Sequence, residues 1–93
     1  MREDMKKLIE KAAAILISSG AREVYVFGSA TSEESALPHD LDLAVSGLPP
    51  ERYFKALGDA IDALGISIDL VDLDEDNPFT RYLKRDGVLA RVA

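Results

Sequence analysis

The hexapeptide Asp40-Leu41-Asp42-Leu43-Ala44-Val45 alternates polar or small residues with aliphatic ones along its whole length. Successive side chains of a β-strand point to opposite faces of a sheet, so the pattern predicts a strand whose three aliphatic side chains enter a core. Asp40 and Asp42 then share the other face, within roughly 7 Å of each other. Two carboxylates this close repel each other unless a cation lies between them.

Two more strands are predicted around this one. Residues 23–27, Glu-Val-Tyr-Val-Phe, lack polar alternation, which is typical of a strand covered on both faces, and this strand stops at Gly28. Residues 66–71, Ile-Ser-Ile-Asp-Leu-Val, alternate again and place Asp69 on their polar face. If this strand lies beside residues 40–45, Asp40, Asp42 and Asp69 converge.

Helices are predicted between and around the strands. Residues 3–19 carry apolar positions at three-and-four spacing and end before Gly20. Pro50 suits the first position of a second helix, whose apolar stripe is Phe54, Leu57, Ile61 and Leu64, supported by Ala56 and Ala60. Asn77 and Pro78 read as the N-cap and first position of a short last helix, after which residues 88–90 pack or fray.

The predicted order is therefore α-β-β-α-β-α within one α/β domain over residues 1–93, a short mixed sheet with helices packed over one face. The 93 residues are 47% apolar and 30% charged, which suffices for one modest core and leaves no room for a second domain. A multidomain enzyme is excluded on this basis.

Charge and composition narrow the choice of ligands and compartment. The formal charge of -6 disfavours direct binding to nucleic acid or an anionic membrane, and the longest apolar run, residues 12–17, is too short to span a bilayer. We expect a cytoplasmic protein. The chain has no cysteine and one histidine, His39, so a thiolate or histidine zinc site is unlikely and any metal must be held by carboxylates. Oxygen ligands of this kind suit Mg²⁺.

Gly28-Ser29 follows the first predicted strand directly, twelve residues before Asp40. A glycine allows the backbone to approach a phosphate, and a following serine can hydrogen-bond its oxygens. Taken with Asp40-x-Asp42 and the later strand aspartate Asp69, the pattern resembles the DNA polymerase β-type nucleotidyltransferases, in particular the minimal nucleotidyltransferases (MNT proteins). The resemblance covers nearly the whole chain.

The resemblance implies a role for each of these residues. Asp40 and Asp42 would coordinate two Mg²⁺ ions, and Asp69 would complete the metal site and help to orient or deprotonate the attacking hydroxyl. Gly28 and Ser29 would hold the β and γ phosphates of ATP. The implied reaction transfers a nucleoside monophosphate, AMP in the first place, to a hydroxyl on a macromolecule, with pyrophosphate as the leaving group.

The resemblance also implies a partner. Small proteins of this type often pair, as antitoxins, with a HEPN-domain ribonuclease, and some modify a tyrosine on it. A domain this small has no region left to bind an acceptor, so we expect a partner chain or a second copy of the chain to supply it.

Residues 31–33, Thr-Ser-Glu, depart from the family, which usually carries an Ala-Arg-Gly element between the serine and the first aspartate. Two further hypotheses follow. The chain could be a catalytically weak or inactive module of the same fold that neutralises its partner by contact. Alternatively, its acidic face could mimic nucleic acid in the basic site of a ribonuclease.

Other features favour structural interpretations. His39 is expected to be a surface loop residue, and the acidic run of residues 72–76 a solvated loop, since Asn77 and Leu83 stand where a calcium loop needs glycine and glutamate. The basic side chains of the last helix are expected to be solvated rather than bound to a triphosphate. The aromatic side chains are expected to pack in a core or interface rather than to stack on a base; they are Tyr25, Phe27, Phe54, Phe79 and Tyr82.

Overall fold

The computed structural model describes residues 3–28, 40–86 and 88–93, leaving out the side chain of Asp40. In chain order the elements are α1 (Glu3–Ser18), β1 (Glu23–Phe27), β2 (Asp40–Ser46), the 3-10 turn η2 (Pro50–Arg52), α2 (Tyr53–Leu64), β3 (Ser67–Asp72), α3 (Pro78–Arg85) and β4 (Ala90–Arg91). The predicted order of elements is confirmed, with a fourth strand added. No helix in the described ranges is long and apolar enough to cross a membrane.

The sheet has the strand order β3-β2-β1-β4. β1 pairs antiparallel with both β2 and β4, whereas β2 and β3 run parallel and are joined through α2. The sheet is therefore mixed, as predicted. The added strand β4 is only two residues long, and residues 88–90 were expected merely to pack or fray; pairing of Ala90 with Val26 gives this segment its strand conformation.

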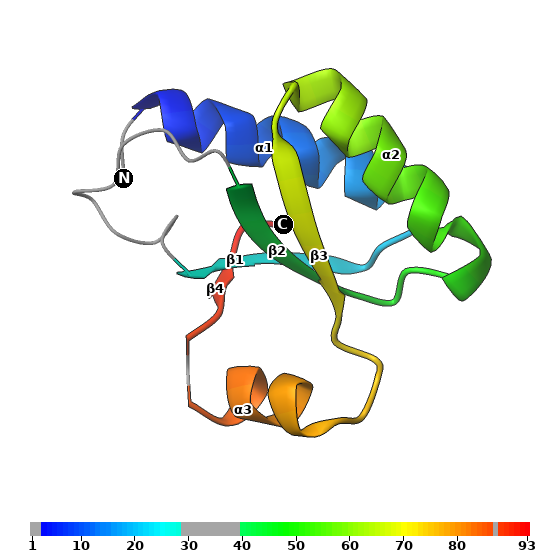
Figure 1. Ribbon diagram of the computed structural model, residues 1–93, viewed down its shortest axis with the longest axis vertical. Coiled ribbons are helices and arrows are strands. Elements are labelled where there is room, and N and C mark those ends of the chain that lie inside the picture. The colour runs from blue at the N-terminus through cyan, green and yellow to red at the C-terminus, as the bar shows by residue number, and fades with distance from the viewer. Residues whose placement is uncertain (1–2, 29–39, 87) are drawn as a thin grey trace.

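The sheet separates two layers, and here the prediction of helices over one face is wrong. Figure 1 shows α1 and α2 together on one side of the sheet and α3 alone on the other. The main core lies under α1 and α2 and includes the buried Leu41, Leu43 and Val45 of β2. A smaller cluster under α3 joins Phe27, Ala44, Leu73 and Leu83. The polar face of β2 is thus covered over part of its length.

The predicted apolar face of α2 is confirmed except at Phe54. Phe54, assigned to the apolar stripe, is 81% exposed, while Ala56 and Ala60 are fully buried and Leu57, Ile61 and Leu64 are partly buried. Small residues let two helices approach closely, so α2 turns its alanines toward the core it shares with Ala12 of α1. Pro50 starts η2 rather than α2 itself, and Tyr53, not Phe54, packs against the core.

Helix α3 starts at a complete capping box. The Asn77 side chain accepts a hydrogen bond from the Thr80 backbone N–H at 2.9 Å, and the buried Thr80 hydroxyl accepts one from the Asn77 N–H at 3.1 Å. The Thr80 hydroxyl also donates to the Glu75 carbonyl at 2.7 Å. These bonds fix the start of α3 against the loop that follows β3, as the N-cap prediction required.

Asn77→Ala should lower the free energy of unfolding by about 1 kcal/mol, because the Thr80 N–H loses its acceptor. Asn77→Ser keeps an oxygen at the cap and should stay within about 0.5 kcal/mol of the native chain. Urea denaturation of both variants measures the difference. Equal stability of the alanine and serine variants would show that the cap contributes nothing.

Candidate functional site

Asp42 and Asp69 are paired across β2 and β3, on the face of the sheet that α3 covers in part. The parallel register of β2 and β3 pairs Asp42 with Asp69, and adjacent strands are about 4.8 Å apart. Paired residues of neighbouring strands point to the same face, so both carboxylates project on the same side of the sheet. Asp42 is half-buried and Asp69 is exposed. The predicted adjacency of the two strands is confirmed.

Asp40 stands at the first position of β2, in register with Ser67. Its place two residues before Asp42 assigns it to the same face of the strand. The Asp40 side chain, Ser29, His39 and residues 31–33 lie outside the described part of the chain. The convergence of all three aspartates therefore stays a prediction.

Gly28 lies on the side of Asp42 that is opposite Asp69, at the end of β1. Phe27 pairs with Asp42 across β1 and β2, so the chain leaves the sheet at Gly28 beside this carboxylate. Gly28 has φ +72°, and a Cβ atom at this position would stand 2.3 Å from Asp42 Oδ2. Only glycine leaves space for the carboxylate here. The sequence analysis singled out Gly28 but did not predict its contact with Asp42. The sequence signal for this contact is that Gly28 follows the end of a strand that pairs with the strand of Asp42.

The donor set suits a hard cation in part. Asp42 and Asp69 offer carboxylate oxygens from neighbouring strands, the ligand type that Mg²⁺ prefers. Within the described ranges, which omit the Asp40 side chain, no three His, Cys, Asp or Glu side chains are grouped to hold a metal ion. Asp42 and Asp69 are therefore two of the three predicted metal ligands, and the side chain of the third, Asp40, lies outside the described part of the chain.

Tyr53 of α2 lies close enough to three carboxylates of β3 and the following loop for them to shift the pKa of its hydroxyl. Tyr53 of α2 donates a hydrogen bond from its hydroxyl to the Leu70 carbonyl, and burial raises the pKa of that hydroxyl. The carboxylates of Asp72, Glu75 and Asp69 raise the Tyr53 pKa further, because they disfavour a phenolate near them. These carboxylates make this part of the surface acidic.

The acidic run after β3 serves the turn itself. Asp72 accepts a hydrogen bond from the Asp74 backbone N–H at 2.9 Å, and Asp74 accepts one from the Gly47 N–H at 2.8 Å. Asp74, Glu75 and Asp76 are exposed. The prediction of a solvated loop rather than a calcium site is in keeping with these contacts.

The basic residues of α3 are exposed and two of them face acidic neighbours. Arg81 Nε lies 2.6 Å from an Asp76 carboxylate oxygen, and Arg85 Nε lies 3.2 Å from one of Asp86. Lys84 lines a separate hollow together with Glu23 and Asp74. All three side chains are exposed, and the expected absence of a contact with a triphosphate stays a prediction.

The chain matches no protein-family model and has no significant match among curated proteins. Solved structures do match. One is a toxin-antitoxin structure with AMP-PNP, at a TM-score of 0.68 and 21% identity over 87% of this chain and 68% of the matched chain. Another is the tri-AMPylated HEPN toxin of Shewanella oneidensis in complex with MNT antitoxin, at a TM-score of 0.66 and 22% identity over 92% and 70%.

A third is the toxin-antitoxin pair MntA-HepT, at a TM-score of 0.61 and 19% identity, covering 97% of this chain and 70% of the matched one. At these identities the likeness is one of fold. The resemblance to MNT antitoxins drawn from the sequence is thus confirmed at the level of the fold.

Gly28→Ala should destabilise the protein more than Gly65→Ala does. Both glycines are left-handed, with φ +72° and +69°, so each substitution carries the same backbone strain of about 1 kcal/mol. A Cβ at Gly65 meets nothing within 4 Å, whereas one at Gly28 displaces the Asp42 carboxylate. We expect an additional loss of about 1–3 kcal/mol at Gly28 in urea denaturation. Equal losses at the two positions would contradict the contact with Asp42.

Proposed function

We propose that this chain is a Mg²⁺-dependent nucleotidyltransferase that transfers AMP from ATP to a hydroxyl on a partner protein, as the antitoxin of a HEPN ribonuclease toxin. The observation that carries the proposal is the row formed by Gly28, which directly follows β1, Asp42 of β2 and Asp69 of β3. The fold shared with MNT antitoxin complexes supports it.

In the proposed site Asp40 and Asp42 hold two Mg²⁺ ions, and Asp69 completes the set. The metal ions, when bound, supply positive charge against the oxygens that gain negative charge as the phosphate reacts. Gly28 brings the backbone close to the β and γ phosphates because it has no side chain, and Ser29 hydrogen-bonds their oxygens.

The transfer itself forms one bond and breaks another at the α-phosphorus. The acceptor hydroxyl oxygen bonds to this phosphorus, the bond from the phosphorus to the bridging oxygen breaks, and pyrophosphate leaves. Asp69 stands at the edge strand and is exposed, so it is the carboxylate that an incoming acceptor meets. We assign to it the orientation of the hydroxyl and the acceptance of its proton.

The acceptor is assigned to a partner chain. The described residues build one sheet and the helices that cover it, and Asp69 opens toward solvent at the β3 edge. One matched structure holds a HEPN toxin that carries three AMP groups beside its MNT antitoxin. By analogy, we propose a HEPN-type toxin hydroxyl as the acceptor for this chain.

Transfer of label from α-³²P-ATP to the co-expressed partner, with Mg²⁺ present, tests the proposal. Asp42→Asn should reduce labelling by about 100-fold or more, since even outer-shell partners of metal ligands are worth about 10–100-fold. Asp62→Asn removes one negative charge from an exposed position of α2 and should leave labelling unchanged.

Three results would overturn the proposal. Equal labelling by the native chain and by Asp42→Asn would show that AMP transfer does not depend on the Asp42 carboxylate. Absence of both labelling and calorimetric ATP binding, with the partner still neutralised, establishes the module that acts by contact alone. Partner binding that is indifferent to ATP and falls steeply with salt supports nucleic-acid mimicry instead.

A further inference from the structure

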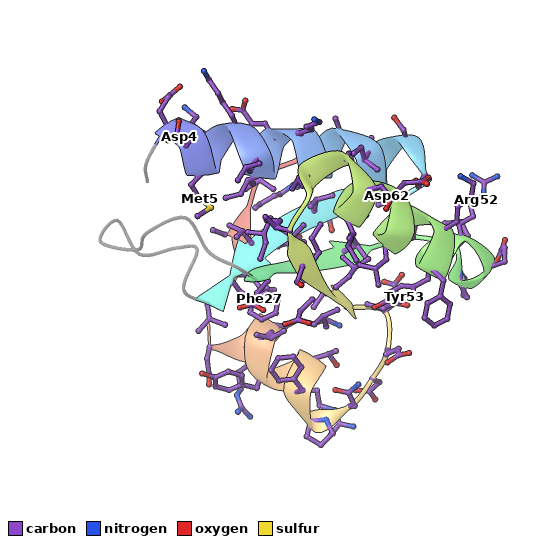
Figure 2. The ribbon with its side chains drawn as sticks, turned by 45° about the horizontal axis from the view of Figure 1, so that its top comes forward. Asp4, Met5, Phe27, Arg52, Tyr53 and Asp62 are labelled. Atoms are coloured by element: carbon purple, nitrogen blue, oxygen red, sulfur yellow. The ribbon has the colours of Figure 1, made fainter. Side chains whose placement is uncertain are left out.

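A hollow of about 440 Å³ lies between the sheet and α3, within the size range of small-molecule sites. Its walls come from β1, the end of β2, the loop after β3 and α3. We call it the Tyr25 hollow, after the ring on one of these walls. Figure 2 labels Phe27 at the end of β1, where the sheet faces α3, and the Tyr25 hollow lies toward the start of this strand.

The floor of the Tyr25 hollow is aliphatic. Leu73 and Leu83 are buried there, and the half-buried Leu89 adds a third aliphatic side chain. Tyr25, which was expected to pack in a core or interface, packs against the same cluster. A ligand with an aliphatic body can therefore remove apolar surface from water by binding here.

Two hydroxyl groups of the hollow are oriented by one carboxylate. The Tyr25 hydroxyl donates to Glu23 Oε1 at 3.1 Å, and the Ser46 hydroxyl donates to the same oxygen at 2.8 Å. The bonds from Ser46 and Tyr25 lower the pKa of Glu23, and burial together with the bond to Glu23 raises the pKa of Tyr25. Each hydroxyl has one proton, which Glu23 takes, so toward a ligand both act as acceptors. This part of the hollow favours a hydrogen-bond donor.

The other polar groups of the hollow are Asp74 and Lys84. Asp74 accepts a hydrogen bond from the Gly47 N–H through Oδ2, at 2.8 Å, and its carboxylate can accept more. Lys84 has three donors and no acceptor, and it makes no hydrogen bond or ion pair with any residue that the structure describes. Lys84 therefore favours a ligand group that accepts hydrogen bonds and carries negative charge.

The charges around the hollow balance. Arg91 Nη1 lies 3.2 Å from Glu23 Oε2, so the Glu23 carboxylate already has a cation beside it. Asp74 and Lys84 carry opposite charges and line the same hollow without forming an ion pair with each other. A ligand with a single charge is attracted by one of these two side chains and repelled by the other, whereas a zwitterion is attracted by both.

The two other hollows of the described chain lack this combination. In the hollow between α1 and α2, Lys55 pairs with Asp59 and Arg52 donates to the Ser19 carbonyl. The hollow at the end of β1 is lined by Gly28, Tyr82 and apolar side chains, with no charged group. Neither offers an unpaired cation opposite a set of acceptors.

We propose that the Tyr25 hollow binds a free α-amino acid with an aliphatic side chain, such as leucine. The ammonium group donates to the Tyr25 and Ser46 hydroxyls, the carboxylate accepts from Lys84, and the aliphatic side chain packs on the leucine floor. The inference does not depend on the proposed function, because none of these residues takes part in AMP transfer.

NMR titration of the full ¹⁵N-labelled chain with L-leucine and two analogues tests the inference. 3-Methylbutylamine lacks the carboxylate of leucine, and 4-methylpentanoate lacks its ammonium group. Leucine should shift the amide signals of Tyr25, Ser46 and Lys84 in a saturable manner. Both analogues should bind at least about 10-fold more weakly, because each leaves a charged group of leucine without its replacement.

Lys84→Met keeps an aliphatic side chain but removes the ammonium group. It should weaken leucine binding by about 10-fold and leave 3-methylbutylamine binding unchanged, since the amine has no carboxylate to lose. Arg85→Met is the matched control, because Arg85 is a neighbouring exposed cation of α3 that does not line the hollow, and leucine binding should be unaffected. The amide spectrum of each variant reports whether it is folded.

Equal affinities of the native chain for leucine and its two analogues overturn the inference, and this comparison needs no variant. Unchanged leucine binding by folded Lys84→Met overturns it as well. So does the absence of shifts at Tyr25 and Ser46 up to about 10 mM leucine. Because no nucleotide is present in the titration, none of these results affects the proposed function.

Discussion

The orientation of β2 is determined by the three aliphatic side chains that it buries in the main core. Leu41, Leu43 and Val45 are fully buried under α1 and α2, and the two-residue period of a strand then places Asp42 on the opposite face. A shift of β2 by one residue would exchange the two sets, placing carboxylates in the core and leucines in water. The large cost of burying unpaired charge holds the register, and the register places Asp42 opposite Asp69.

The same constraint accounts for the division of the second face. Toward one end, Ala44 replaces aspartate in the alternation, and its small side chain is buried with Phe27, Leu73 and Leu83 under α3. Toward the other end the aspartates leave the face polar. Gly28 lies between the part covered by α3 and the acidic part. It therefore lies beside the Asp42 carboxylate and also lines the hollow that Phe79 and Tyr82 of α3 border. The change from the buried part of this face to its acidic part thus occurs between Ala44 and Asp42 of β2.

Local pattern was enough to predict β1, β2 and β3 and the shared face of Asp42 and Asp69, because strand alternation is a property of consecutive residues. The Asn77 cap was predictable for the same reason. The side of the sheet taken by α3 was not, since an amphipathic helix reveals which of its faces is buried but not what covers it. The exposure of Phe54 was also missed, because the close approach of α1 and α2 through alanines decides the rotation of α2. The contact of Gly28 with Asp42 depends on pairing between strands separated by residues 29–39.

In the proposed function, the carboxylates of β2 and β3 hold Mg²⁺. Substituting Mn²⁺ for Mg²⁺ in the presence of ATP tests it directly, because the paramagnetic ion broadens the NMR signals of nearby amides. If the cation binds at Asp42 and Asp69, we expect a low Mn²⁺ concentration to remove the amide signals of Gly28, Asp42 and Asp69. The amide signals of residues 74–76 should persist. Broadening centred on residues 72–76, with Asp42 and Asp69 unaffected, would contradict it.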